Sequence, residues 1–207
     1  MFKYYEFAVR KAKKGWSYRK ELTKQYIIKL DADILTLQEV NPQTFLVDFS
    51  FMHELGYDFF MEESNNNWMR CAIFWRRDKL MLAQAEHRVY KCQIAQLKIL
   101  NSSSDCEPTS TGLMAQKWVF VLTCHLSAIN PTKRVRELED AMFHVEQMRK
   151  RSRIHPDHVA LLLSGDMNTF TDIANSPVRR FLLDGMIGPD YNAKYPVHKG
   201  GTGELRL

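Results

Sequence analysis

The chain of 207 residues lacks any apolar run that approaches the roughly 18 residues needed to span a membrane. It also lacks the pattern of a signal peptide, because no long apolar stretch follows the charged residues at its start. We therefore expect an intracellular protein, cytoplasmic or nuclear, without a membrane span. Hydrophobic residues make up 45% of the chain, which is typical of a globular domain with a full core.

Cysteine is scarce, and no two cysteines form a CxxC pair. The four are widely spaced: Cys71, Cys92, Cys106 and Cys124. This spacing excludes a zinc site of the usual kind and a disulfide framework, and it predicts free thiols in a reducing compartment. Internal repeats and interdomain linkers are absent as well. We therefore expect one domain over residues 16–207, preceded by a basic segment at residues 1–15.

Positive charge exceeds negative charge, with a formal net charge of +5. Residues 1–24 carry eight lysines and arginines against two glutamates, and a second basic group lies at residues 149–153. Such groups favour polyanionic partners such as RNA or DNA. A solvated helix face explains them equally well.

Hydrophobic periodicity predicts a mixed α/β chain. A helix is expected at residues 17–29, with its apolar face formed by Tyr18, Leu22, Tyr26 and Leu30. An apolar strand at residues 34–40 is expected to be buried on both faces. Asn41-Pro42 is a typical start for a helix that Gly56 would end.

The middle of the chain predicts a run of strands separated by polar turns. These expected strands lie at residues 71–75, 80–84, 87–90, 93–100 and 117–123. A helix at residues 132–151, a strand at 158–164 and a short helix at 177–185 follow. Two packed sheets with helices outside suit this order.

Three apolar strands end in polar side chains. They end at Leu37-Gln38-Glu39-Val40, Thr123-Cys124-His125-Leu126 and Ser164-Gly165-Asp166-Met167-Asn168. Since α/β proteins build their sites at the carboxyl edge of the sheet, these ends are expected to converge. Glu39, His125, Asp166 and Asn168 therefore suggest a hard-metal phosphoesterase site.

Each of these side chains also has an ordinary structural explanation. Glu39 either binds a metal or caps the following helix. Asp166 and Asn168 either activate water and orient a phosphate, or form an Asx turn. His125 either donates a hydrogen bond to a phosphoryl oxygen or is a satisfied histidine at the sheet edge. Among the tryptophans, Trp68 lies in an expected loop and is the candidate for stacking on a base, whereas Trp75 and Trp118 are expected in the core.

The order of the three strand-end strings resembles the endonuclease/exonuclease/phosphatase superfamily, whose fold is like that of deoxyribonuclease I. Further strings resemble its deadenylase branch, which includes the carbon-catabolite-repression deadenylases, nocturnin and the angel proteins. They are Trp16-Ser17-Tyr18-Arg19, Cys71-Ala72-Ile73-Phe74-Trp75 and Ser176-Pro177-Val178. The resemblance implies a two-sheet α/β sandwich flanked by helices.

The resemblance also implies a Mg²⁺-dependent phosphodiesterase acting on RNA, with a 3′ poly(A) tail as the substrate. Glu39 and Asp166 would bind Mg²⁺, and Asp166 would help to activate the attacking water. Asn168 and His125 would contact the scissile phosphate. A phosphatase acting on a lipid headgroup or a small phosphate ester, and a non-catalytic scaffold, are the alternatives on the same fold.

The resemblance stops short of both ends of the family's domain. No apolar strand ending in Asn occurs in residues 1–15, and residues 199–205 contain no Asp-His motif. Arg70 also stands where the family has a small glycine. We therefore expect a domain truncated at both ends, with slow RNA hydrolysis or none.

Overall fold

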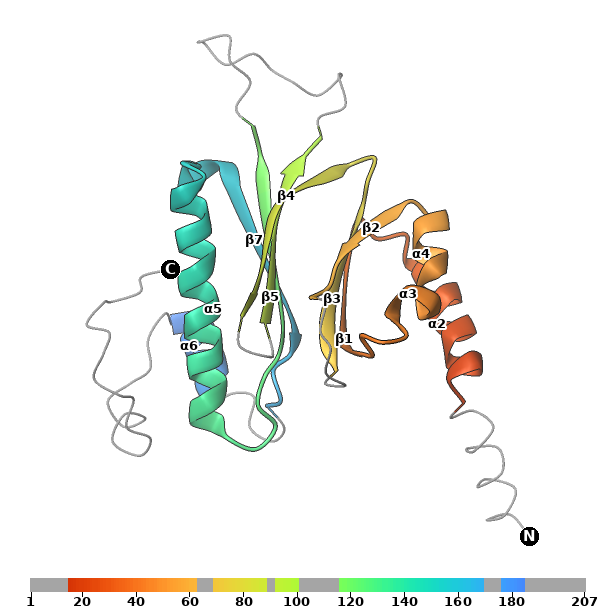
Figure 1. Cartoon of the computed structure of the whole chain (residues 1–207). Helices are drawn as coiled ribbons and strands as arrows, with labels where there is room; N and C mark the ends of the chain where they lie inside the picture. The colour runs from red at the N-terminus through yellow and green to blue at the C-terminus, as the bar shows by residue number, and fades with distance from the viewer. Residues whose placement is uncertain (1–14, 63–68, 89–91, 101–115, 170–175, 185–207) are drawn as a thin grey trace.

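The computed structural model describes residues 15–62, 69–88, 92–100, 116–169 and 176–184. These residues form four layers, in which two facing β-sheets are each covered on the outside by helices (Figure 1). The two-sheet sandwich flanked by helices that the sequence predicted is confirmed.

Three antiparallel strands form the smaller sheet, in the order β1 (Ile34–Val40), β3 (Arg70–Arg76) and β2 (Tyr57–Phe60). Its outer face is covered by α2 (Trp16–Leu30), α3 (Phe45–Asp48) and α4 (Ser50–Glu54). An aromatic core joins these layers. Phe45, which is 1% exposed, packs with ring centroids 5.3 Å from Phe49 and 5.7 Å from Phe74. Burial of such large rings fixes the short helices on the sheet.

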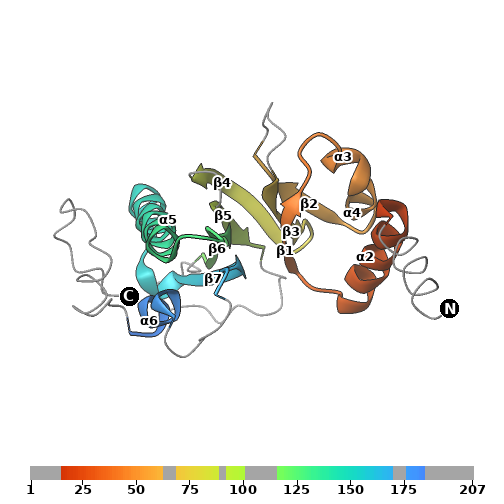
Figure 2. The ribbon, with the colours of Figure 1, turned by 90° about the horizontal axis from the view of Figure 1, so that it is seen from below.

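Four strands form the larger sheet, in the order β4 (Leu80–Arg88), β5 (Cys92–Ile99), β6 (Trp118–His125) and β7 (Val159–Asp166). The outer face is covered by α5 (Pro131–Arg151) and α6 (Pro177–Asp184), and the short 3₁₀ helix η1 (Pro156–His158) precedes β7. β7 runs parallel to β6, which requires a crossover connection, and α5 supplies it. Figure 2 shows α5 and α6 on one side of the sandwich and α2 to α4 on the other.

A third group of apolar side chains fills the space between the sheets. Ile73 and Trp75 from the smaller sheet pack with Ala95, Leu97 and Val121 from the larger one, and all five are at most 3% exposed. The sheets therefore hold a fixed position relative to each other. This fixed position is what allows strand ends from both sheets to contribute to one site.

The structure corrects several details of the helices. The apolar face expected on α2 is wrong, because Tyr18, Tyr26 and Leu30 are exposed and Ile27 is the buried residue of this helix. Its inward side also carries Lys20, whose Nζ donates to Val47 O at 2.7 Å. The charge of a lysine suggests the solvent side of a helix, but its apolar stem can lie against the protein while its ammonium group reaches a polar partner. The charge of Lys20 was therefore a poor guide to which side of α2 faces the protein.

The helix expected to start at Asn41-Pro42 begins later and is split in two. Asn41 Oδ1 accepts a hydrogen bond from Gln43 N at 3.0 Å, which forms a turn before α3 begins at Phe45. Gly56 follows α4 with a φ of 86°, as expected for a residue that ends a helix. β2 was not predicted. The strand expected at residues 80–84 and the first half of the one expected at 87–90 belong to the single strand β4, and residues 89–90 lie outside the described part of the chain.

β1 and β7 are edge strands of their sheets in the described part of the chain, and the prediction that β1 is buried on both faces is wrong. Val40 is the buried residue of β1, and Leu161 and Leu162 of β7 are each 41% exposed. An edge strand pairs on one side, so the described layers cover it incompletely. Within the described residues, no helix combines the length and the apolar character needed to cross a membrane.

Candidate active site

The parallel pairing of β6 with β7 brings His125 and Asp166 together. The two residues are register partners at the last position of their strands. Register partners share a face of the sheet, and His125 Nε2 lies 3.9 Å from Asp166 Oδ2. The backbone also joins the two strand ends, because Leu126 N donates to Asp166 O at 2.8 Å.

A β-bulge in the other sheet directs Glu39 toward the same imidazole. In a regular strand Glu39 would face the helices with Leu35 and Leu37, which pack in the core beneath them. The register of β1 on β3 instead shifts between Leu37 and Val40, and Glu39 has a φ of 59°. Bulges re-aim side chains next to sites, and Glu39 Oε1 lies 3.8 Å from His125 Nε2. One imidazole nitrogen therefore faces carboxylates from both sheets.

Two side-chain hydrogen bonds join the sheets directly behind these residues. Gln38 Nε2 donates to Thr123 Oγ1 at 3.1 Å, and the hydroxyls of Thr36 and Ser164 are 2.9 Å apart. Gln38, Thr123 and Ser164 lie one or two positions before Glu39, His125 and Asp166, and Thr36 lies on the same strand as Glu39. They were not predicted to have a role, although polar side chains inside apolar strands gave a signal for it.

Asn168 forms hydrogen bonds that hold the end of β7 against the end of β6. Its backbone N–H donates to Asp166 Oδ1 at 2.8 Å, and its Nδ2 donates to Leu126 O at 2.7 Å. Asn168 is 5% exposed and has a φ of 51°. The Asx turn is therefore present, and it is this turn that orients the Asp166 carboxylate.

The donor set of the site suits a hard divalent cation. The side chains of Glu39 and Asp166 are 68% and 50% exposed, whereas that of His125 is 26% exposed. Mg²⁺ is commonly bound through one or two carboxylates and keeps waters or phosphate oxygens as its other ligands. The described residues include no preformed group of three His, Cys, Asp or Glu side chains that would enclose a metal. Two open carboxylates fit Mg²⁺ better than a metal that needs a closed cage.

A second histidine also has two carboxylate neighbours, but it lies outside this setting. His144 on α5 is 3.7 Å from Glu86 Oε2 and 3.5 Å from Asp140 Oδ1. Glu86 also pairs with Arg151, so this cluster links α5 to β4 on the outer layer of the molecule. A histidine close to two carboxylates is therefore not enough to identify the candidate site. What distinguishes His125 from His144 is that its carboxylate neighbours come from strand ends of both sheets.

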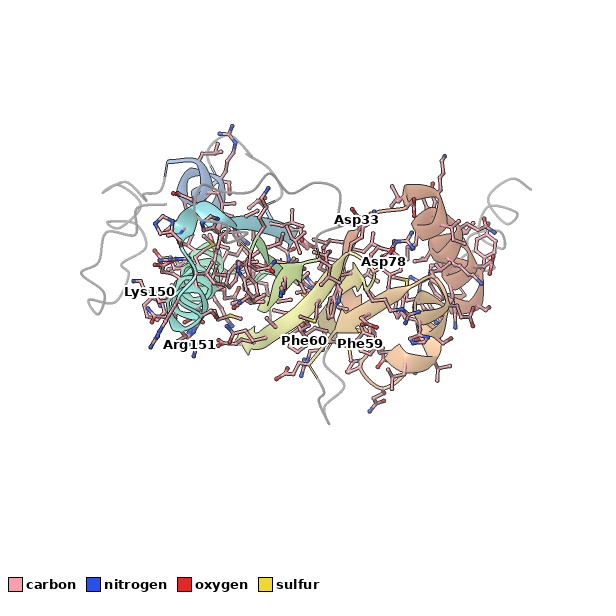
Figure 3. All side chains as sticks on the ribbon, turned by 90° about the horizontal axis from the view of Figure 1, so that it is seen from above. Asp33, Phe59, Phe60, Asp78, Lys150 and Arg151 are labelled. Carbon is pink, nitrogen blue, oxygen red and sulfur yellow. The ribbon has the colours of Figure 1, made fainter. Side chains whose placement is uncertain are left out.

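The basic group at residues 149–153 lies at the opposite end of the molecule. α5 begins after the strand end that carries the site and spans 21 residues, a length of about 30 Å. Figure 3 labels Lys150 and Arg151 at the end of this helix. Arg149 and Lys150 pair with Glu146, and cations are favourable at a helix C-terminus. The structural explanation therefore accounts for this group.

Two glutamates of α5 have pKa values that are shifted in opposite directions, and for different reasons. Hydrogen bonds from Arg149 hold the pKa of Glu146 below its usual range, whereas burial raises the pKa of Glu139. A lowered folded-state pKa stabilises the fold above the unfolded pKa, and the gain is lost as the pH falls through the folded pKa. A raised carboxyl pKa has the reverse sign, so stability is lost as the pH rises.

We therefore expect Glu146→Gln to lower the melting temperature at neutral pH by about 2 °C or less, since the pair is partly solvated. This difference should shrink on acidification toward about pH 3. Glu139→Gln is the matched control and should leave the melting temperature at pH 7 unchanged or higher. Melting curves followed by circular dichroism check both, and equal losses in the two variants would contradict the assignment.

The remaining predicted residues have mixed outcomes. Trp75 is 3% exposed and Trp118 packs against the core beneath α5, as predicted. Trp68 and residues 1–14 lie outside the described residues. Arg70 begins β3 opposite Val40, is 4% exposed, and its Nε lies 3.3 Å from Glu62 Oε2.

Two sequence relatives each match about two fifths of the chain. CCR4-NOT transcription complex subunit 6-like-A of Xenopus laevis is 40% identical over 92 residues, covering 39% of this chain and 16% of that protein. Carbon catabolite repressor protein 4 homolog 3 of Arabidopsis thaliana is 32% identical over 91 residues, covering 41% of this chain and 20% of that protein.

Solved structures show the same fold. ANGEL2, described as a 2′,3′-cyclic phosphatase, superposes with a TM-score of 0.64 at 18% identity, covering 83% of this chain and 49% of ANGEL2. The human Nocturnin catalytic domain gives a TM-score of 0.54 at 20% identity, covering 86% of this chain and 71% of that domain. The chain thus spans about half the length of ANGEL2.

The comparison with protein families extends over more of the chain than either sequence relative. The sequence matches the Endonuclease/Exonuclease/phosphatase family from residue 6 to residue 198, a range that includes all three strand-end strings. Because this match covers most of the sequence, the chain belongs to the Endonuclease/Exonuclease/phosphatase family, as the order of its strings predicted.

Proposed function

We propose that this chain is a Mg²⁺-dependent phosphodiesterase that removes nucleotides from the 3′ end of RNA, with poly(A) as its substrate. The observation that carries the proposal is the position of His125 Nε2, 3.8 Å from Glu39 and 3.9 Å from Asp166 at the shared edge of the sheets. The resemblance to the deadenylase branch supports RNA as the substrate class.

In this proposal Glu39 and Asp166 would hold the cation through their carboxylate oxygens. When bound, Mg²⁺ supplies positive charge that offsets the negative charge developing on the phosphate. Asp166 Oδ2 accepts the proton of the attacking water, because Oδ1 already accepts the N–H of Asn168. A carboxylate fixed on one side in this way keeps its other oxygen in a defined direction.

In this proposal the imidazole of His125 and the side-chain amide of Asn168 contact the phosphate. His125 donates a hydrogen bond to a phosphoryl oxygen as negative charge develops there. Asn168 keeps Asp166 and the end of β6 in place, and its second amide N–H contacts the phosphate. Trp68, outside the described residues, stays the candidate base contact.

A phosphatase acting on a small phosphate ester or a lipid headgroup is the second candidate function. ANGEL2, which shares the fold, is named a 2′,3′-cyclic phosphatase. In the proposed mechanism Glu39, His125 and Asp166 act on the phosphate and not on the rest of a substrate, so the same chemistry serves a phosphomonoester. The substrate must therefore be decided by assay.

The test compares three substrates with Mg²⁺ and with EDTA, using protein in excess so that slow turnover is detected. They are 5′-labelled oligo(A) with a 3′-hydroxyl, the same oligonucleotide with a 2′,3′-cyclic phosphate, and an inositol phosphate headgroup. The proposal expects stepwise, EDTA-sensitive shortening of the first. Phosphate release from the others alone would favour the phosphatase, and binding of oligo(A) without any product would favour the non-catalytic alternative.

A further inference from the structure

Cys92 and Cys124 stand directly opposite each other on the antiparallel strands β5 and β6. Opposed residues in such a ladder alternate between hydrogen-bonded and non-hydrogen-bonded pairs. Ile99 N donates to Lys117 O at 3.1 Å, which makes Ile99 and Lys117 a hydrogen-bonded pair. Continued to the other end of the ladder, the alternation makes the cysteines a non-hydrogen-bonded pair, with Cα atoms about 4.5 Å apart.

The two thiols lie in the same part of the core, between the larger sheet and α5. Cys92 is 2% exposed and Cys124 is fully buried, and both are free thiols. The neighbouring Cys124 thiol, together with burial, raises the pKa of Cys92. Cα separations of about 4.4–6.8 Å allow a disulfide without large backbone movement.

The backbone of Cys124 is tightly coupled to the strand end that carries Asp166. Cys124 precedes His125, and its register partner on β7 is Gly165. A Cβ atom at Gly165 would lie 2.0 Å from Cys124 O, so there is no room for a side chain at this position against β6. A change in the position of Cys124 therefore moves His125 and presses on the residue before Asp166.

We propose that Cys92 and Cys124 form a reversible cross-strand disulfide under oxidising conditions, and that this bond disturbs the adjacent site. Hydrogen peroxide oxidises one thiol to a sulfenic acid with release of one water, and the sulfur of the second thiol then displaces the sulfenic hydroxyl group, which leaves as a second water. The thiols lose two electrons and two protons, which reduce one peroxide to two waters.

Peptide mapping of the folded full chain tests the bond itself. Trypsin releases each cysteine in a separate peptide, with Cys92 in residues 92–98 and Cys124 in residues 118–133. Peroxide treatment should join these two peptides with the loss of two hydrogen atoms, and dithiothreitol should separate them. Cys92→Ser and Cys92→Ala should abolish the linked pair, whereas Cys71→Ser, which removes a buried thiol of the other sheet, should not.

The effect on the site rests on the proposed function and is measured on the same samples. Oligo(A) cleavage should fall about 10²-fold on oxidation, as for a displaced catalytic group, and should recover on reduction. The Cys92 variants should resist this loss. A digest without the linked pair overturns the proposal, and so does a linked pair with unchanged cleavage. If the reduced protein cleaves no RNA, the proposed function fails, while the peptide map still decides whether the disulfide forms.

Discussion

The Gly165→Ala variant is expected to lose about 3–5 kcal/mol of stability, or to release β7 from the sheet. Gly165 has a φ of 137°, where side chains are strained, and its Cβ would lie 2.0 Å from Cys124 O. Backbone atoms of a central strand cannot move aside without breaking the ladder. Urea unfolding followed by circular dichroism measures the loss.

Gly56→Ala is the matched control for this prediction. Gly56 has a φ of 86°, but the nearest atom to its Cβ would be the flexible Arg76 Nη1 at 3.7 Å. Only conformational strain applies there, and it costs about 1–2 kcal/mol. Equal losses in the two variants would show that strain alone, and not the close approach of β6 to β7, determines the effect at Gly165.

Asp166→Asn and Glu39→Gln are expected to lower kcat/KM for oligo(A) by about 10²–10³-fold each, with little change in stability. Both carboxylates are exposed, and both substitutions keep the shape of the side chain while removing its charge. The amide of Asn at 166 can still accept the N–H of Asn168, so the turn should persist. Cleavage assays at saturating Mg²⁺, together with melting temperatures, check the two statements.

Asp140→Asn provides the control for these variants. Asp140 also neighbours a histidine, at 3.5 Å from His144 Nε2, but it lies on α5 outside the strand-end edge. Its substitution should leave kcat/KM unchanged. A loss equal to that of Asp166→Asn would mean that the effect reflects general electrostatics of the protein rather than the chemistry of the site.

The sequence predicted the candidate residues because each stands at the end of an apolar strand. It could not predict how Glu39 reaches His125, since that depends on a bulge whose register is set by pairing with β3, more than 30 residues away. It also did not indicate the bonds between Gln38 and Thr123 or between Thr36 and Ser164, which exist because two sheets meet face to face. Long-range packing decides both features.

The errors in the fold have a similar origin. Periodicity on α2 identified an apolar face, but the residue of this helix that is buried is Ile27, and Lys20 donates to Val47 O. β2 is four residues long and includes Asp58, so its local pattern was too short to indicate a strand. β1 and β7 are apolar yet lie at sheet edges in the described part of the chain, because strand order is not encoded in the composition of a single strand.

The central claim is that Glu39 and Asp166 form one divalent-cation site beside His125, and Mn²⁺ titration followed by NMR of the histidine side chains tests it most directly. Mn²⁺ replaces Mg²⁺ at oxygen-rich sites and broadens the signals of nearby nuclei. At substoichiometric Mn²⁺ the imidazole signals of His125 should broaden first, while those of His144, His155 and His158 persist. Excess Mg²⁺ should reverse the broadening, and Glu39→Gln or Asp166→Asn should weaken it. Uniform broadening of all histidines, or none at His125, would contradict the account.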